Sequence, residues 1–247
     1  MSLIVISQPY YFPWVGLFEQ LKMCDIFVHY DDVQFIKRHF MDRVQIPVSN
    51  KISWMSVPKL KSSQKTIIND IKIDYSSPWQ KSHINLLNQA YRKARFKDEM
   101  LNLVESVFSK NHKYLSDLTI ESIMSVSEYF NLSEGKKFDR SSEIRTVGKG
   151  SGRLLNIIKH YKSDRYLTAM GALKYLDFEL FESNNISVEF IDYKKVPYTQ
   201  QNFGFNPYVS ILDLIACHGK DGAKYICSGS IHWKDFINSE EAKAYLK

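Results

Sequence analysis

Apolar and polar positions along the chain fall into short blocks, and the first three blocks predict a strand, a helix and a second strand. The apolar run at 3–7 is typical of a buried strand. Leu17, Leu21 and Cys24 then recur at helical spacing. Residues 25–30 return to β-branched and aromatic side chains. A strand, a helix and a strand in this order most simply form a right-handed parallel crossover.

The middle of the chain changes from short strand-like runs to longer helical patterns. Apolar runs at 52–58 and 67–73 predict two strands that pair as an antiparallel extension. Amphipathic helical patterns follow at 79–95, at about 98–110 and at about 115–130. These patterns predict a largely helical subregion at about 77–135.

A second α/β stretch follows the helical subregion. Its predicted elements are, in order, a helix at 154–161, a strand at 165–168, a helix at about 174–184, a strand at 187–191 and a helix at about 208–218. The order of elements favours a single α/β domain over residues 1–247. We expect an open, mainly parallel, Rossmann-like sheet with helices packed around it and a largely helical middle region.

The composition is that of an ordinary globular protein. Hydrophobic residues make up 44% of the 247 positions and charged residues 24%. No apolar run approaches the about 20 residues that span a bilayer, and the first run lacks the flanks of a signal peptide. We therefore expect a cytoplasmic protein without membrane insertion. The three cysteines show no metal-binding spacing, which predicts reduced structural thiols and no metal site. The oligomeric state stays open.

The net charge of +6 favours an anionic partner. The Lys and Arg residues form small groups with acids between them, and no recognisable nucleic-acid-binding motif is present. A nucleotide or another phosphorylated small molecule therefore explains the charge as well as a nucleic acid does.

The connector SQPYYFPWVGLF, directly after the first strand, is the first candidate wall of a site. A plain connector is short, polar and rich in Gly, Asn or Asp, whereas this one holds two prolines and a group of aromatic side chains. Gln8, Tyr11 and Trp14 are candidates for substrate binding at a strand end, with Trp14 stacking on a base or a sugar face. Packing of the aromatic side chains beneath the sheet is the alternative.

Two neighbouring carboxylates follow the second predicted strand. Because Asp31 and Asp32 repel each other, one of them can hold a proton near neutral pH and act as a general base. Successive side chains of a strand diverge, so a solvated or capping role stays open for at least one aspartate.

Two basic segments are candidates for binding phosphate. Arg38 and Arg43 suit bidentate contacts with a diphosphate, and Lys37 is a candidate for stabilising an oxyanion. In GKGSGR, which precedes a predicted helix, Lys149, Arg153 and the backbone amides can cradle a phosphate group. An ordinary basic surface and a flexible turn are the respective alternatives.

The remaining candidates are a histidine and a polar group near the C-terminal end. His83 lies on an amphipathic helix and is a second candidate base, because amide formation needs a base that takes a proton from the attacking ammonium. A packed histidine is the alternative. Hydrogen-bonding groups of the kind that sugar hydroxyls require come from Tyr198, Gln200, Ser210 and Asp213.

Four motifs together resemble one family. QPYYFPWVGLF, DDVQFIKRHFMDRVQI, SSPWQKSH and PYTQQNFGFNPYVSILDLIACHG occur in the order and at the spacing of the WbqC-like family. That family is met in gene clusters for bacterial O-antigen and related surface-glycan synthesis. Two positions depart from its pattern: Phe12 stands where an aliphatic residue is commoner, and Asp42 stands where Asn is expected.

The resemblance implies chemistry on a nucleotide-linked amino sugar. The implied reaction is transfer of an acyl group, an aminoacyl group such as glycyl, to the amine of the sugar. ATP or an activated aminoacyl donor would be the co-substrate, and an aminoacyl-tRNA is a candidate partner. Two alternatives stay open: a sugar-nucleotide binding protein of glycan assembly without catalysis, and an RNA-binding protein that uses charged tRNA.

Overall fold

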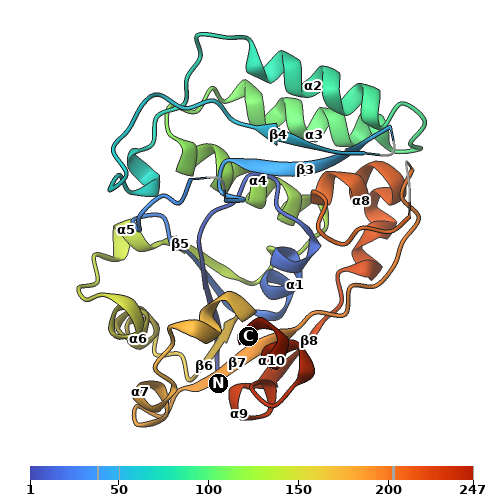
Figure 1. The fold of residues 1–247 in the computed structure, drawn as a ribbon. Helices are drawn as coiled ribbons and strands as arrows, with labels where there is room; N and C mark the ends of the chain where they lie inside the picture. Colours follow the sequence, from blue (N-terminus) through green and yellow to red (C-terminus); the bar gives the residue numbers. More distant parts are fainter. Residues whose placement is uncertain (38, 50, 202–203, 247) are drawn as a thin grey trace.

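A β-sheet with helices on both faces organises the chain (Figure 1). The computed structural model describes residues 1–37, 39–49, 51–201 and 204–246. Within these residues the main sheet has six strands in the order β5-β2-β1-β6-β7-β8. They are β1 (Leu3–Ser7), β2 (Ile26–His29), β5 (Lys137–Arg140), β6 (Arg165–Thr168), β7 (Ser187–Asp192) and β8 (Gly229–His232). All neighbouring pairs are parallel except β7 and β8. The prediction of an open, mainly parallel, Rossmann-like sheet is confirmed.

The central strands are buried on both faces. Val5 and Phe27 belong to one hydrophobic core, Ile4 and Val28 belong to the other, and all four are fully buried. Successive strand side chains point to opposite faces. Continuous apolar runs are therefore what a sheet covered on both sides requires.

Each core joins one face of the sheet to its own set of helices. The first core contains residues of α1 (Val15–Met23), α2 (Trp79–Ala90), α3 (Lys97–Ser109), α4 (Leu115–Tyr129) and α8 (Ile211–His218). The second contains residues of α6 (Gly150–His160), α7 (Phe178–Glu182), α9 (Trp233–Phe236) and α10 (Glu240–Leu246). The short elements are α5 (Ser141–Ile144), η1 (Ile68–Asp70), η2 (Met170–Lys174) and η3 (Gly219–Tyr225). α2, α3 and α4 occupy the region of the predicted helical patterns.

A separate antiparallel pair contributes Val44, Ile46 and Met55 to the first core and lies beside α2 and α3 (Figure 1). It consists of β3 (Arg43–Val48) and β4 (Lys51–Ser56). We expected the run at 52–58 to pair with 67–73, and that pairing is wrong. Residues 67–73 contain η1 and isolated bridges, since Asn and Asp are poor strand formers and interrupt this run. The segment just before β4 pairs with it instead, because a short connection closes with little loss of entropy.

Candidate functional site

The chain reverses its direction of strand addition at β1. It passes from β1 outward to β2 and β5, and then returns to β6 on the other side of β1. In open α/β sheets, ligands bind outside the carboxyl ends of the strands at this reversal. The candidate site therefore lies where β1, β2 and β6 end. We call this region the carboxyl edge of the sheet.

Asp31 is fully buried after β2, and its carboxylate binds the start of α5. Its Oδ1 accepts a hydrogen bond from the Ser142 N–H at 3.1 Å, and its Oδ2 accepts one from the Ser142 hydroxyl at 2.9 Å. The Ser141 hydroxyl lies 3.2 Å from Oδ1 of Asp31 and 2.5 Å from Oδ1 of Asp32. Its single proton can bind only one of them at a time. Asp31 therefore has the capping role that the sequence left open for one of the two aspartates.

Asp32 pairs with Arg153 at the edge of the sheet. The two side chains form an ion pair and are 18% and 12% exposed, respectively. The guanidinium carbon of Arg153 also lies 5.1 Å from the centroid of the Tyr30 ring. Asp32 thus retains the solvent access that Asp31 lacks, and an anion that enters here competes with Asp32 for Arg153.

The segment at 148–153, which ends in the first turn of α6, places the N-terminus of that helix at the same edge. Gly148 and Gly150 take φ values of +109° and +51°, a region that favours glycine. Lys149 is the N-cap residue, and among the described residues no side chain caps this end of α6. Its first backbone N–H groups therefore suit an anionic ligand, since the helix dipole also favours negative charge there.

Three tyrosines gather around this edge. The Tyr10 hydroxyl donates to Oε1 of Gln8 at 3.3 Å. Burial, with a smaller contribution from Tyr175, raises the pKa of Tyr10 to about 12. Burial and the neighbouring Tyr30 raise the pKa of Tyr175, and burial raises that of Tyr30. All three hydroxyls stay protonated at neutral pH and can donate hydrogen bonds, and their rings offer apolar faces to a sugar.

Comparison with known proteins identifies one family. Residues 8–225, which include Gln8, Asp32 and Arg153, match the profile of the WbqC-like protein family. The chain belongs to this family. Over 229 residues it is 28% identical to the uncharacterized protein Rv1507c of Mycobacterium tuberculosis, which covers 92% of this chain and 98% of that protein. No solved structure matches this WbqC-like chain significantly. The family inferred from the four motifs is confirmed.

In the part of this WbqC-like chain that the structure describes, no helix has the length and apolar character needed to cross a membrane. Nor do three or more His, Cys, Asp or Glu side chains of this part lie together as a metal site. Cys24, Cys217 and Cys227 are free thiols, and Cys24 is buried.

Tyr11 and His83 form a buried pair between the first connector and α2 of the WbqC-like protein. His83 Nε2 lies 3.1 Å from the carbonyl oxygen of Ser56, which can only accept, so the ring proton is assigned to Nε2. Nδ1 then accepts from the Tyr11 hydroxyl at 3.0 Å. Burial lowers the pKa of His83 to about 4, so the ring is neutral at pH 7. The packed-histidine alternative describes His83.

We expect His83 to make the protein less stable in acid. Its pKa falls from the ordinary 6.5 to about 4 on folding, so the unfolded chain takes up the proton first as the pH drops. The contribution of His83 to the free energy of unfolding is present above about pH 6.5 and is lost as the pH falls toward 4. Between pH 7 and pH 5 the loss is roughly 2 kcal/mol. Urea unfolding at both pH values measures this loss.

His83→Gln should reduce the acid loss by about that amount, and His160→Gln, at the exposed end of α6, should leave it unchanged. An acid loss in His83→Gln equal to that of the unsubstituted protein contradicts the assignment.

Trp14 packs on tyrosines of the protein itself. Its ring lies edge-on to Tyr193, with 4.5 Å between centroids, and 5.5 Å from Tyr208. A Cβ on Gly16 would lie 2.5 Å from the Trp14 ring, so glycine leaves room for the indole. The packing alternative therefore describes Trp14, which belongs to an aromatic cluster beside α1.

Hydrogen bonds of Ser210 connect the start of α8 to the first connector. Its hydroxyl donates to the Phe12 carbonyl at 2.7 Å and accepts from the Leu212 N–H at 3.2 Å, which caps α8. The Ile211 N–H donates to the Pro13 carbonyl at 2.9 Å. The first and the fourth motif are thus joined directly.

Asp213 and its neighbours are also inside the fold. Asp213 is fully buried, and burial raises its pKa to about 7, against the opposing effect of Tyr198, Tyr91 and Gln200. Gln200 exchanges two hydrogen bonds with the backbone of Asn206, at 2.8 Å and 3.0 Å. The structure places these predicted sugar ligands in the interior, where they hold the loop before α8.

The basic residues that lie between β2 and the start of β3 differ in their surroundings. Lys37 is exposed, and the Arg43 guanidinium carbon lies 4.1 Å over the ring of Trp54. Arg38 lies outside the described residues.

His39 is a neighbour of the edge that the sequence analysis missed. Its ring lies 5.9 Å from that of Tyr10, between centroids. Burial and Arg43 lower its pKa. Its position in the same motif as Asp32 was the available signal. The structure thus brings Gln8, Asp32, Lys149 and Arg153 to one edge, with three tyrosines and His39 around them.

Proposed function

We propose that this WbqC-like protein transfers an acyl group to the amine of a nucleotide-linked amino sugar in the synthesis of a bacterial surface glycan. The acyl group is an aminoacyl group, glycyl in the simplest case. The resemblance to the family supports the type of reaction, and the carboxyl edge of the sheet supports the location of the substrate.

The observation that carries the proposal is the Asp32–Arg153 pair beside the N-terminus of α6. An arginine, uncapped backbone N–H groups and Lys149 favour the diphosphate of a nucleotide sugar. The reversal of strand order at β1 is where open α/β sheets bind nucleotides. A diphosphate at this point would take Arg153 from Asp32 and leave the carboxylate free beside the substrate.

The tyrosines at the edge fit the sugar of such a ligand. Tyr10 and Tyr30 follow β1 and β2, and Tyr175 follows η2, so three segments supply the rings. Sugar rings combine apolar faces with hydroxyls, which suits tyrosines that stack and donate hydrogen bonds.

Asp32 is the base in the proposed reaction. It takes a proton from the ammonium of the sugar, and the free amine attacks the carbonyl carbon of the activated donor. A C–N bond forms, and the carbonyl π pair moves to oxygen, where backbone amides stabilise the oxyanion. Collapse breaks the bond to the leaving group, which departs with the electron pair and receives the second nitrogen proton.

The donor must arrive activated or be activated with ATP. An aminoacyl-tRNA ester and an aminoacyl adenylate made from an amino acid and ATP both supply a carbonyl with a good leaving group. Aminoacyl-tRNA and ATP are both anionic, which agrees with the net charge of +6.

The test is a product assay. The protein is incubated with a panel of nucleotide-linked amino sugars, together with glycine and ATP or with glycyl-tRNA, and the sugar product is weighed by mass spectrometry. We expect an amide-linked aminoacyl sugar with one donor. Tight binding of a sugar nucleotide without product would favour the non-catalytic alternative. Binding of tRNA that weakens steeply with salt, without binding of sugar nucleotides, would favour the RNA-binding alternative.

A further inference from the structure

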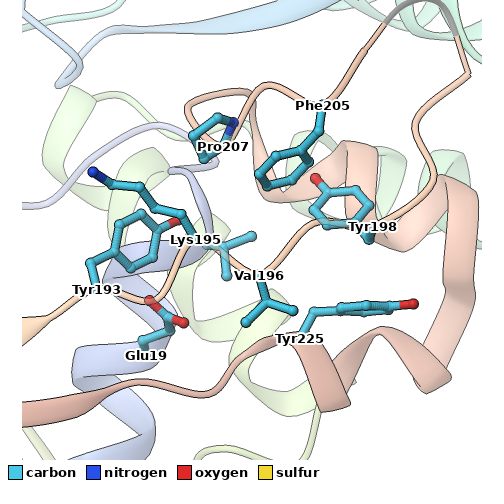
Figure 2. A pocket seen from close by; sticks show the side chains of 9 residues that line it. Glu19, Tyr193, Lys195, Val196, Tyr198, Phe205, Pro207 and Tyr225 are labelled. Atoms are coloured by element: carbon cyan, nitrogen blue, oxygen red, sulfur yellow. The ribbon is translucent and has the colours of Figure 1, made fainter.

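A small cavity lies beside α1 and shares none of its lining residues with the carboxyl edge. Figure 2 shows it between α1 and the segment that follows β7. Its walls are mostly aromatic and apolar, and include Tyr193, Tyr198, Phe205, Tyr225 and Val196. The enclosed space admits a group about the size of one water molecule, and the cavity is partly open to solvent.

Glu19 supplies the carboxylate of this cavity. Only 1% of the residue is exposed. Its Oε1 accepts a hydrogen bond from the Cys227 N–H at 3.2 Å, and its Oε2 meets no donor at hydrogen-bond geometry among the described residues, although the nearby Ser228 hydroxyl lowers the pKa of the carboxyl. A buried carboxylate oxygen without a partner is unfavourable by several kcal/mol unless a cation or a proton compensates it.

The nearby lysines have other partners. Lys22 donates to the Ile226 carbonyl at 2.7 Å. Lys195 lies 3.3 Å from Glu241, and Figure 2 shows its ammonium turned away from Val196 and Tyr225. The cavity is therefore lined by Glu19, by aromatic faces and by Lys195, whose charge Glu241 balances, so the Glu19 carboxylate is the charged group left to attract a cation.

We propose that this cavity binds a primary ammonium group, with Glu19 as its counter-ion. An ammonium head has about the size of a water molecule, and it can donate to Oε2 of Glu19. Its remaining charge faces tyrosine and phenylalanine rings, which attract cations. The remainder of the ligand leaves through the open side of the cavity. A small amine and a free amino acid share this chemistry. The proposal does not depend on the proposed acyl transfer.

The pH dependence has a definite sign. Burial raises the pKa of Glu19 to about 7, although hydrogen bonds from Ser228 and the Cys227 N–H and the charge of Lys22 act to lower it. Tyr193 and Lys195 are the other titratable groups that line the cavity. Binding of an ammonium at pH 7 therefore releases a proton from Glu19. We expect affinity to rise from pH 6 to pH 8 and then to level off.

The experiment is isothermal titration calorimetry on the full chain with methylammonium chloride, with glycine, and with potassium chloride as the ionic control. Two buffers of different ionisation enthalpy at pH 7 report the released proton. We expect methylammonium to bind and potassium not to bind. Glu19→Gln keeps the shape and an acceptor for the Cys227 N–H, and should weaken binding more than tenfold. Glu240→Gln, at a 94% exposed side chain, should leave it unchanged.

Tyr225→Leu, which leaves the carboxylate in place, should weaken binding several-fold, so the proposal does not rest on one variant. Glu19-dependent binding of glycine alone would support the site with an amino acid as its ligand. Binding of neither amine, or equal binding by Glu19→Gln, overturns the proposal, and the cavity then holds water beside a protonated Glu19.

Discussion

Asp32→Asn is expected to lower kcat by ~100-fold or more, with the affinity for the nucleotide sugar little changed. The amide keeps the size of the carboxylate and its hydrogen bonds to neighbouring donors, but it cannot take the proton of the ammonium. The measurement is the initial rate of product formation at saturating substrate, followed as a function of pH.

Two variants separate this role from others. Asp98→Asn, at an 88% exposed side chain of α3, should retain full turnover. Asp31→Asn should reduce the free energy of unfolding, since it replaces one of the two carboxylate oxygens that accept from the start of α5 by an NH2 donor. Near-normal kcat and an unchanged pH profile in folded Asp32→Asn would remove the base from this position. His39, beside Tyr10, would then be the next side chain to replace.

Arg153→Ala should raise the Kd for a nucleoside diphosphate sugar by ~10- to 150-fold, because a charge-assisted contact to phosphate contributes about 1.5–3 kcal/mol. Calorimetric titration with the nucleotide sugar and with the free amino sugar measures it. Only the nucleotide-linked ligand should lose affinity. Arg153→Lys should restore part of the affinity, since lysine keeps the charge but not the bidentate geometry.

Arg92→Ala provides the matched control, because Arg92 is exposed after α2. Its Kd should equal that of the unsubstituted protein. An unchanged Kd in Arg153→Ala would mean that Arg153 only neutralises Asp32, and the phosphate would have to bind elsewhere.

Of the main sheet, the sequence predicted the four inner strands. β1, β2, β6 and β7 lie inside the sheet and are covered on both faces. Because such strands are rich in apolar residues, their burial can be predicted from local sequence. β5, with the sequence KFDR, and β8, with the sequence GSIH, were not predicted. Both are four-residue edge strands in which few side chains need be apolar, so no periodic signal marks them.

The candidate site was predictable as a location and not as a set of contacts. The order of elements indicated that the ends of the first two strands share an edge, and β1 and β2 are indeed parallel neighbours. Which aspartate is buried depends on Ser141 and Ser142, about 110 residues further along the chain. The partner of Asp32 is 121 residues away. Local sequence holds no record of such pairings.

The aromatic residues illustrate the same limit. Tyr11, Trp14 and Tyr10 lie within five positions of one connector, yet they contact His83, Tyr193 and His39, respectively. Whether a side chain of this connector faces the core or the edge depends on elements that are distant in sequence. Tyr11, which is fully buried, and Tyr10, which is partly exposed, are neighbours in the same local pattern.

The central position of β1 also governs how the chain can fold. β1 begins at residue 3, but its inner neighbour β6 begins at residue 165, and the Ser2 N–H donates to Asp164 at 2.9 Å across 162 residues. Most of the chain must therefore leave the ribosome before the middle of the sheet can close. Until then the apolar edge of β1 lacks its partner, and such long-range closures fold slowly and leave unpaired strands open to aggregation. The two halves of this sheet are thus joined late, by a pair of strands that lie far apart in the sequence.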